Sequence, residues 1–113
     1  MILVLGSLVA RPDHHAQALA LSQEHVARSR AEPGCIAHAV HQDTENALRL
    51  VFVEQWSNMA ALQEHFKVPA SRAFARSVAA LASEPPKVEI YDATQVLAWG
   101  SAYRLPDASG AAP

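Results

Sequence analysis

The sequence predicts an α+β domain built on a four-stranded antiparallel sheet with helices on one face. The length of 113 residues suits one domain with a modest core. The hydrophobic patterns follow the order strand, helix, strand, strand, interrupted helix, strand, which is the split β-α-β order of ferredoxin-like folds. The strand expected at residues 48–56 is apolar on both faces. Because the helices can cover only one face, we expect a second copy of the chain, as a homodimer, on the other.

The first third of the chain predicts a strand and a helix. Residues 2–10 are aliphatic and β-branched without helical spacing, which favours a buried strand. They lack a preceding basic segment and are too short to span a bilayer, so we interpret them neither as a signal peptide nor as a membrane span. Pro12 or Asp13 begins a helix that runs to about Glu32, where Pro33-Gly34 ends it. Its expected inner stripe comprises Ala16, Leu19, Ala20, Gln23, Val26, Ala27 and Arg30.

The middle of the chain predicts two strands joined at residues 43–46. In residues 35–42, Ile36, His38 and Val40 share one face, and His41 lies on the other. The strand at residues 48–56 shows the clearest alternation. One face carries Leu48, Leu50, Phe52, Glu54 and Trp56, and the other carries Arg49, Val51, Val53 and Gln55.

Two helical segments and a last strand follow. Ser57 or Asn58 caps a helix with Met59, Leu62 and Phe66 on one side. Pro69 interrupts it, and a second segment covers residues 71–82 until Pro85-Pro86. The last strand runs from Lys87 to Tyr91, or as far as Val96. We therefore expect one domain at residues 1–97 and a flexible tail or dimer arm at residues 98–113.

Composition excludes several classes of function. The net charge is -2 without long runs of one sign, so neither nucleic acid nor an anionic membrane surface is an expected partner. The single Cys35 allows no internal disulfide and suits the reducing cytoplasm. No glycine-rich nucleotide motif or Cys-x-x-Cys pair occurs, and the six histidines show no zinc-type spacing. We therefore expect no organic cofactor and no metal.

Three motifs carry a resemblance to a known family. They are Glu32-Pro33-Gly34-Cys35, then Val53-Glu54-Gln55-Trp56, then Leu62-Gln63-Glu64-His65-Phe66-Lys67-Val68-Pro69. In this order and on these elements, over roughly residues 1–96, the chain resembles the antibiotic biosynthesis monooxygenase family, with the quinol monooxygenase branch most similar. The resemblance implies a dimeric α+β barrel. It also implies cofactor-independent oxidation by O2 of a small electron-rich aromatic, such as a quinol or an anthrone.

The implied chemistry needs a base more than it needs a cofactor. A deprotonated phenol or enol can pass one electron to O2 directly, so the protein must bind the substrate in a dry pocket, remove a proton and hold the anion. Two features depart from the family pattern. Ala70 stands where the quinol branch often has a second histidine. Haem-degrading relatives have asparagine, tryptophan and histidine where this chain has Gly6 or Ser7, His65 and Ala75, which argues against haem.

The candidate catalytic residues are His65, Glu54 and Trp56. Histidine is the side chain best suited to remove a proton near neutral pH, although a helix histidine such as His65 often only hydrogen-bonds a neighbour. Glu54 lies on an apolar face and therefore needs a partner. That partner is a histidine, Arg72, Arg76 or a residue of the second copy. Trp56 is either a pocket wall that stacks on a planar substrate or an anchor of the core or the dimer interface.

The candidate substrate-binding residues are Phe52, Leu62, Phe66, Arg76 and His38. Arg76 would steady an anionic substrate, with a solvated arginine as the simpler interpretation. His38 and His41 lie on opposite strand faces, so at most one of them points into a pocket. Two other functions stay open: a non-catalytic barrel that binds a small ligand or serves as an accessory subunit, and, more weakly, an isomerase or decarboxylase. An anaerobic assay separates the latter from an oxygenase.

Overall fold

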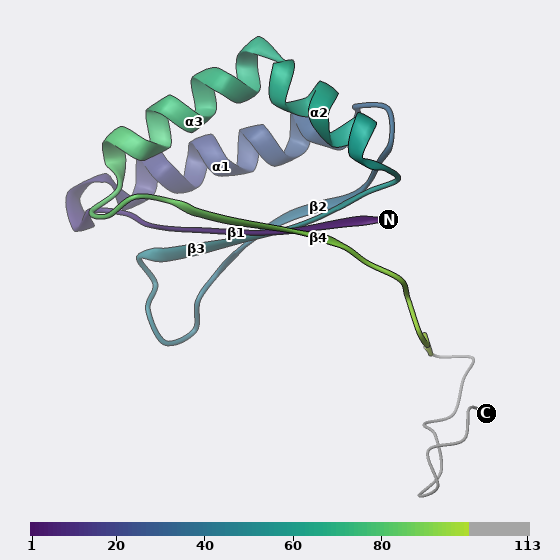
Figure 1. Ribbon diagram of the computed structural model, residues 1–113. Helices are drawn as coiled ribbons and strands as arrows, with labels where there is room; N and C mark the ends of the chain where they lie inside the picture. The colour runs from purple at the N-terminus through teal and green to yellow at the C-terminus, as the bar shows by residue number, and fades with distance from the viewer. Residues whose placement is uncertain (100–113) are drawn as a thin grey trace, which may run out of the picture.

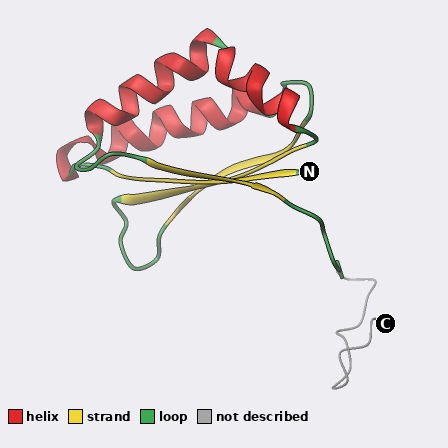
Figure 2. Cartoon of the chain, in the orientation of Figure 1, coloured by secondary structure: helices red, strands yellow, loops and turns green. Residues whose placement is uncertain are grey.

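Helices cover one face of a four-stranded sheet in the computed structural model, which describes residues 1–99 (Figure 1). The elements are β1 (Ile2–Val9), the short 3-10 helix η1 (Pro12–His14), α1 (His15–Ser29), β2 (Cys35–Gln42), β3 (Arg49–Trp56), α2 (Met59–Lys67), α3 (Pro69–Leu81) and β4 (Lys87–Asp92). Figure 2 shows all the helices on the same side of the strands. The predicted α+β, ferredoxin-like fold is confirmed.

The sheet has the strand order β2-β3-β1-β4, and every neighbouring pair is antiparallel. In the centre, Val4 pairs with Glu54, and Gly6 pairs with Phe52. On β2, His38 lies opposite the same Glu54. This register brings a histidine and a carboxylate together on the face that the helices cover.

The helix ends differ from the prediction in ways that proline and glycine explain. Pro69 does not interrupt a helix but begins α3, where its fixed φ and missing N–H suit the first turn. Val68, the residue before it, is extended and ends α2. Asn58 is the N-cap of α2, and its side chain accepts a hydrogen bond from the Ala61 N–H at 2.9 Å. β4 ends at Asp92 and does not extend to Val96.

Helix α1 buries a different face from the one that its aliphatic residues predicted. Its buried residues are Ala18, Ser22, His25, Val26 and Ser29, whereas most of the predicted stripe is exposed. Two serines tolerate this burial because their hydroxyls donate to carbonyl oxygens one turn back. Ser22 Oγ donates to the Ala18 carbonyl and Ser29 Oγ to the His25 carbonyl, both at 2.7 Å. The small residues on this face, Ala18, Ser22 and Ser29, let α1 pack against α3 and β2.

Strand β2 contains a register shift between Cys35 and Ala37 that regular alternation did not predict. As a result Ile36, expected to share the inner face of His38 and Val40, is 56% exposed. Cys35 takes the inner position opposite Trp56 and packs against that end of the core.

The buried side chains form two clusters. One contains Leu8, Ala18, Val26, Leu50 and Val78, among others, and joins α1 and α3 to the sheet. The other consists of Ile2, Val4, Trp56 and Leu62 and joins α2 to the sheet. No helix in the described part of the chain is long and apolar enough to cross a membrane. The expected tail at residues 98–113 falls almost wholly outside the described residues.

Candidate active site

A cavity of about 240 Å³ opens between the inner face of the sheet and helices α2 and α3. Its polar lining includes His25, Glu54, His65 and Arg72, while its apolar walls include Phe52 and Phe74. Such a concave, largely apolar space with a few convergent polar groups is typical of a small-molecule site.

His65 borders this cavity from α2 and is only 4% exposed. Its Nδ1 lies 2.9 Å and 3.2 Å from the two carboxylate oxygens of Glu32. Because an ionised carboxylate can only accept, Nδ1 carries the proton in the neutral form of the ring, and in that form the lone pair is on Nε2. The Trp56 ring lies beside the imidazole, with 4.7 Å between ring centroids.

The loop after α1 places Glu32 against this histidine. Gly34 turns the chain with a φ of +82°, a conformation that residues with a Cβ rarely adopt. Its carbonyl oxygen accepts a hydrogen bond from the Ser57 N–H at 2.8 Å, just before α2 begins. A Cβ at Gly34 would lie 2.5 Å from the Ala61 Cβ, so glycine also permits close packing of the loop on α2. The Glu-Pro-Gly motif thereby packs against the start of α2 and places the Glu32 carboxylate beside His65, near the end of that helix.

Glu54 is the centre of a second polar group on β2 and β3. Its Oε1 accepts a hydrogen bond from Trp56 Nε1 at 2.9 Å and lies 3.2 Å from His38 Nε2. The contact with His38 is close enough for charge attraction but is not a well-directed hydrogen bond. Burial raises the pKa of the Glu54 carboxyl, but the contacts with His38 and Trp56 outweigh burial, so this pKa lies below its usual value. Glu54 is therefore a carboxylate that faces an apolar cavity.

His25 is a further polar residue of the cavity lining, and our sequence analysis assigned it no role. Its ring stacks on Phe74 with 4.0 Å between centroids and a 5° angle between planes. Burial, together with the neighbouring His38 and His65, lowers the pKa of His25 to about 3, so the ring is neutral near pH 7. The small residues at Ala18, Ser22 and Ser29 were the available signal, because they mark the inward face that also carries His25.

Some of the remaining candidate residues line the cavity, and others are buried behind its lining. Phe52 and Phe66 line the cavity. Trp56, Leu62 and His38 are buried behind that lining and are not part of it. These three therefore support the site without facing the open space.

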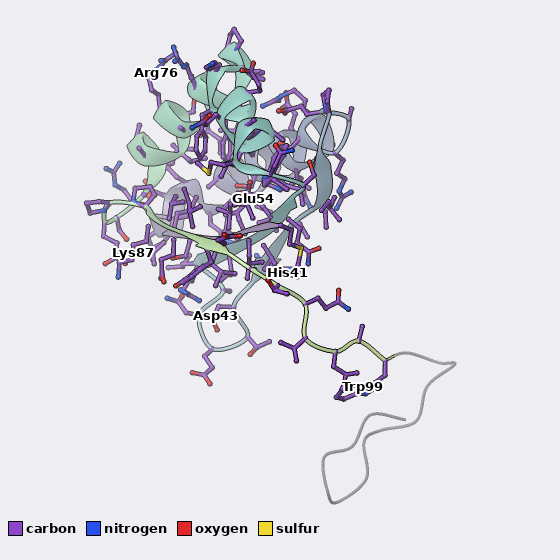
Figure 3. All side chains as sticks on the ribbon, turned by 45° about the vertical axis from the view of Figure 1, so that its right-hand side comes forward. His41, Asp43, Glu54, Arg76, Lys87 and Trp99 are labelled. Carbon is purple, nitrogen blue, oxygen red and sulfur yellow. The ribbon has the colours of Figure 1, made fainter. Side chains whose placement is uncertain are left out.

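Arg76 requires a correction, because it is exposed and does not line the cavity. Figure 3 shows it projecting outward from α3, whereas Glu54 lies in the interior between sheet and helices. Positions 72 and 76 lie on the same side of α3, about 40° apart around its axis, but only Arg72 is close enough to the start of the helix to reach Phe66 and the cavity. Arg72 lines the cavity instead, and its Nε donates to the Phe66 carbonyl oxygen at 3.2 Å.

Comparisons with known proteins identify the family. The family model for antibiotic biosynthesis monooxygenases matches residues 1–77. The chain belongs to the antibiotic biosynthesis monooxygenase family. It is also 36% identical over 90 residues to an uncharacterized protein of Synechocystis sp.. That match covers 80% of this chain but only 61% of the Synechocystis protein, so the chain spans less than two thirds of this relative.

Solved structures of similar fold agree with the family assignment. One is a crystal structure of an antibiotic biosynthesis monooxygenase, with a TM-score of 0.78 and 26% sequence identity. The match covers 84% of this chain and 100% of the chain in that structure. The Pseudomonas aeruginosa protein PA3566 has a TM-score of 0.75 and 28% identity, covering 83% of this chain and 94% of its own. The Mycobacterium tuberculosis protein Rv0793 has a TM-score of 0.80, and the match covers 86% of this chain and 98% of Rv0793. At 24% identity, this likeness supports the fold alone.

Proposed function

We propose that this family member is a cofactor-independent monooxygenase that oxidises a small electron-rich aromatic, of the quinol or anthrone class, with O2. The observation that carries the proposal is the Glu32–His65 pair beside an apolar cavity. A carboxylate that fixes the Nδ1 proton of a buried histidine leaves a basic Nε2 and stabilises the imidazolium once a proton arrives. This is the arrangement that a general base requires.

The proposed reaction begins when His65 Nε2 takes a proton from the bound phenol or enol. The resulting anion transfers one electron to O2, and the two radicals combine to form a carbon–oxygen bond. The hydroperoxide then loses water. For an anthrone the net change is a ring CH2 plus O2 giving a ring C=O plus H2O, so one oxygen atom enters the product and the other leaves as water. The proton returns from His65 to the departing oxygen.

The remaining lining residues fit this chemistry. Phe52, Phe66 and Phe74 provide apolar walls for a planar substrate. Arg72 is the cationic side chain among the lining residues of helix α3, and we propose that it replaces Arg76 in steadying the substrate anion. The cavity volume of about 240 Å³ limits the substrate to a small molecule.

We further propose that two copies pair through the outer sheet face to form the barrel. That face carries Leu3, Leu5, Val51 and Val53, which alternate along β1 and β3 with the buried residues that face the helices. Leu5 is 37% exposed in the single chain. An apolar sheet face of this kind is stable when a second layer covers it. The single cysteine is consistent with a cytoplasmic location.

Oxygen consumption with a panel of quinols and anthrones tests the proposed activity. His65→Ala should lower turnover of a responsive substrate by roughly a hundredfold or more, the usual range for losing a general base. Glu32→Gln should lower it less, because the base remains but its orientation and charge partner are lost. His14→Ala is the matched control, since His14 is partly exposed in η1 and lies neither in the cavity lining nor on the outer sheet face. Equal rates for His65→Ala and His14→Ala would refute the assignment of the base.

Ala70 favours a second candidate, a ligand-binding protein without turnover, because it leaves the site with one histidine fewer than the quinol branch often has. In that case the same aromatics bind with no oxygen uptake. An isomerase or decarboxylase would instead convert its substrate at the same rate under nitrogen and in air.

A further inference from the structure

Three histidines from separate elements meet at the inner wall of the cavity. They are His25 on α1, His38 on β2 and His65 on α2, and each is at most 6% exposed. The ring centroids are 5.3 Å to 5.9 Å apart. One ring nitrogen of each lies within 4.8 Å of the corresponding nitrogens of the other two. Three imidazole nitrogens therefore converge on one buried point.

Two of the three rings, those of His25 and His38, have buried nitrogens without ordinary partners. Nδ1 of His25 and both ring nitrogens of His38 are buried without a hydrogen bond to any residue that the structure describes. Buried polar atoms are nearly always paired, because an unpaired one loses its hydrogen bonds to water and gains none in return. Packing explains the stack of His25 on Phe74, but it does not explain why both His25 and His38 have buried ring nitrogens without partners. A bound cation would accept one lone pair from each ring, and the other nitrogen of His38 would keep its proton.

A carboxylate lies beside a ring nitrogen in two of the three histidines. Glu32 accepts from Nδ1 of His65, and Glu54 lies 3.2 Å from Nε2 of His38. Metal-binding histidines usually donate the other ring N–H to a carboxylate or carbonyl, which fixes the ring and makes the ligating nitrogen more basic. Glu32 holds His65 in this way, and Glu54 brings a negative charge that would offset the charge of a cation.

We propose that His25, His38 and His65 form a binding site for one divalent transition-metal ion of the kind that imidazole prefers, such as Zn²⁺. Metal–nitrogen bonds of about 2.0–2.1 Å in a tetrahedron put ligand atoms about 3.4 Å apart, so the site needs a modest contraction from the present separations. Imidazole ligands suit zinc, copper, iron and nickel rather than magnesium or calcium. Because His25 and His65 also line the cavity, the fourth position would face the space where a small molecule binds.

The metal site does not depend on the proposed oxygenase activity. An ion would occupy the lone pair of His65 that the base requires, so the metal-bound protein and the base-active protein are alternative states. Zinc should therefore inhibit a quinol oxidase built on His65. Binding itself can be measured whether or not any substrate is turned over.

Metal titration of the untagged full-length chain, stripped with EDTA, tests the proposal directly. Co²⁺ should bind at one ion per chain with the visible absorption of a tetrahedral site, and Zn²⁺ should displace it. His25→Phe and His38→Phe keep a planar ring of similar shape but remove the ligand, and each should weaken Zn²⁺ binding at least about tenfold. His14→Phe is the matched control at the surface of η1, and its affinity should equal that of the wild type.

Three results would overturn the proposal: no binding to the stripped wild-type chain, wild-type affinity in His25→Phe, or a loss of affinity in His14→Phe as large as that in His25→Phe. A measurement without substitutions covers the case in which a variant does not fold. Imidazole ¹H–¹⁵N spectra of the wild type should show His25, His38 and His65 shifting with one equivalent of Zn²⁺ while His14, His15 and His41 stay in place. Shifts confined to the latter three would mean adventitious surface binding and would also refute the site.

Discussion

Replacing Gly34 with alanine should destabilise the protein strongly, and its cost follows from the local geometry. The φ of +82° is unfavourable for alanine by about 1–2 kcal/mol. The new Cβ would lie 2.5 Å from the Ala61 Cβ and 2.9 Å from Ser57 Oγ, so α2 must move away from the loop. Overpacking of this kind costs about 1–3 kcal/mol. We therefore expect Gly34→Ala to lower the free energy of unfolding by about 2–5 kcal/mol.

Gly6 offers the same substitution in a permissive setting. Its φ is not positive, and an added Cβ would meet the Phe52 Cβ at 3.5 Å, which is ordinary contact. Gly6→Ala should therefore leave stability unchanged or raise it by up to about 1 kcal/mol, because alanine restricts the unfolded chain. Gly6 also lines the cavity, so this variant should reduce the space available to a ligand.

Urea unfolding followed by far-ultraviolet circular dichroism, at one fixed protein concentration, measures both variants. A double variant, Gly34→Ala with Ala61→Gly, separates the two causes. It removes the Cβ contact but not the φ strain, so it should cost less than the sum of the two single changes. The reasoning fails if Gly34→Ala is as stable as the wild type, or if Gly6→Ala costs as much as Gly34→Ala.

Two further predictions concern pH and assembly. Burial holds the pKa of His25 at about 3 in the folded chain, against about 6.5 unfolded, so the unfolded state takes up the extra proton as pH falls. In EDTA, stability should therefore drop below about pH 6.5 and level off near pH 3. We expect the free energy of unfolding to fall by about 1 kcal/mol by pH 5, a value reduced to allow for solvent screening because His25 borders the cavity. Urea unfolding of His25→Phe should show a weaker dependence on pH. An equally steep dependence in this variant would contradict the assignment to His25. Light scattering should give twice the chain mass, and Val53→Glu on the outer sheet face should give monomers. Arg76→Glu, on the exposed side of α3, should stay dimeric, and a well-folded wild-type monomer would refute the dimer.

Local patterns were sufficient for the order of the elements and for the family. The alternation from Leu50 to Trp56 identified β3, because side chains on a strand point to opposite faces in turn. Pro33-Gly34 and Pro85-Pro86 marked turns through backbone restrictions that act within a few residues. The Glu-Pro-Gly, Glu-x-Trp and Leu-x-x-His motifs pointed to the family that residues 1–77 match.

Only the tertiary structure decided which residues meet. The buried face of α1 is polar in composition, and its two serines are satisfied by carbonyls of their own helix, so hydrophobicity alone pointed to the wrong face. The bulge in β2 turned Ile36 outward, which no alternation rule foresees. His25, His38 and His65 are 13 and 27 residues apart in sequence, and no short motif joins them. Their meeting depends on how α1, β2 and α2 dock, because contact between elements is set by packing in space and not by spacing along the chain.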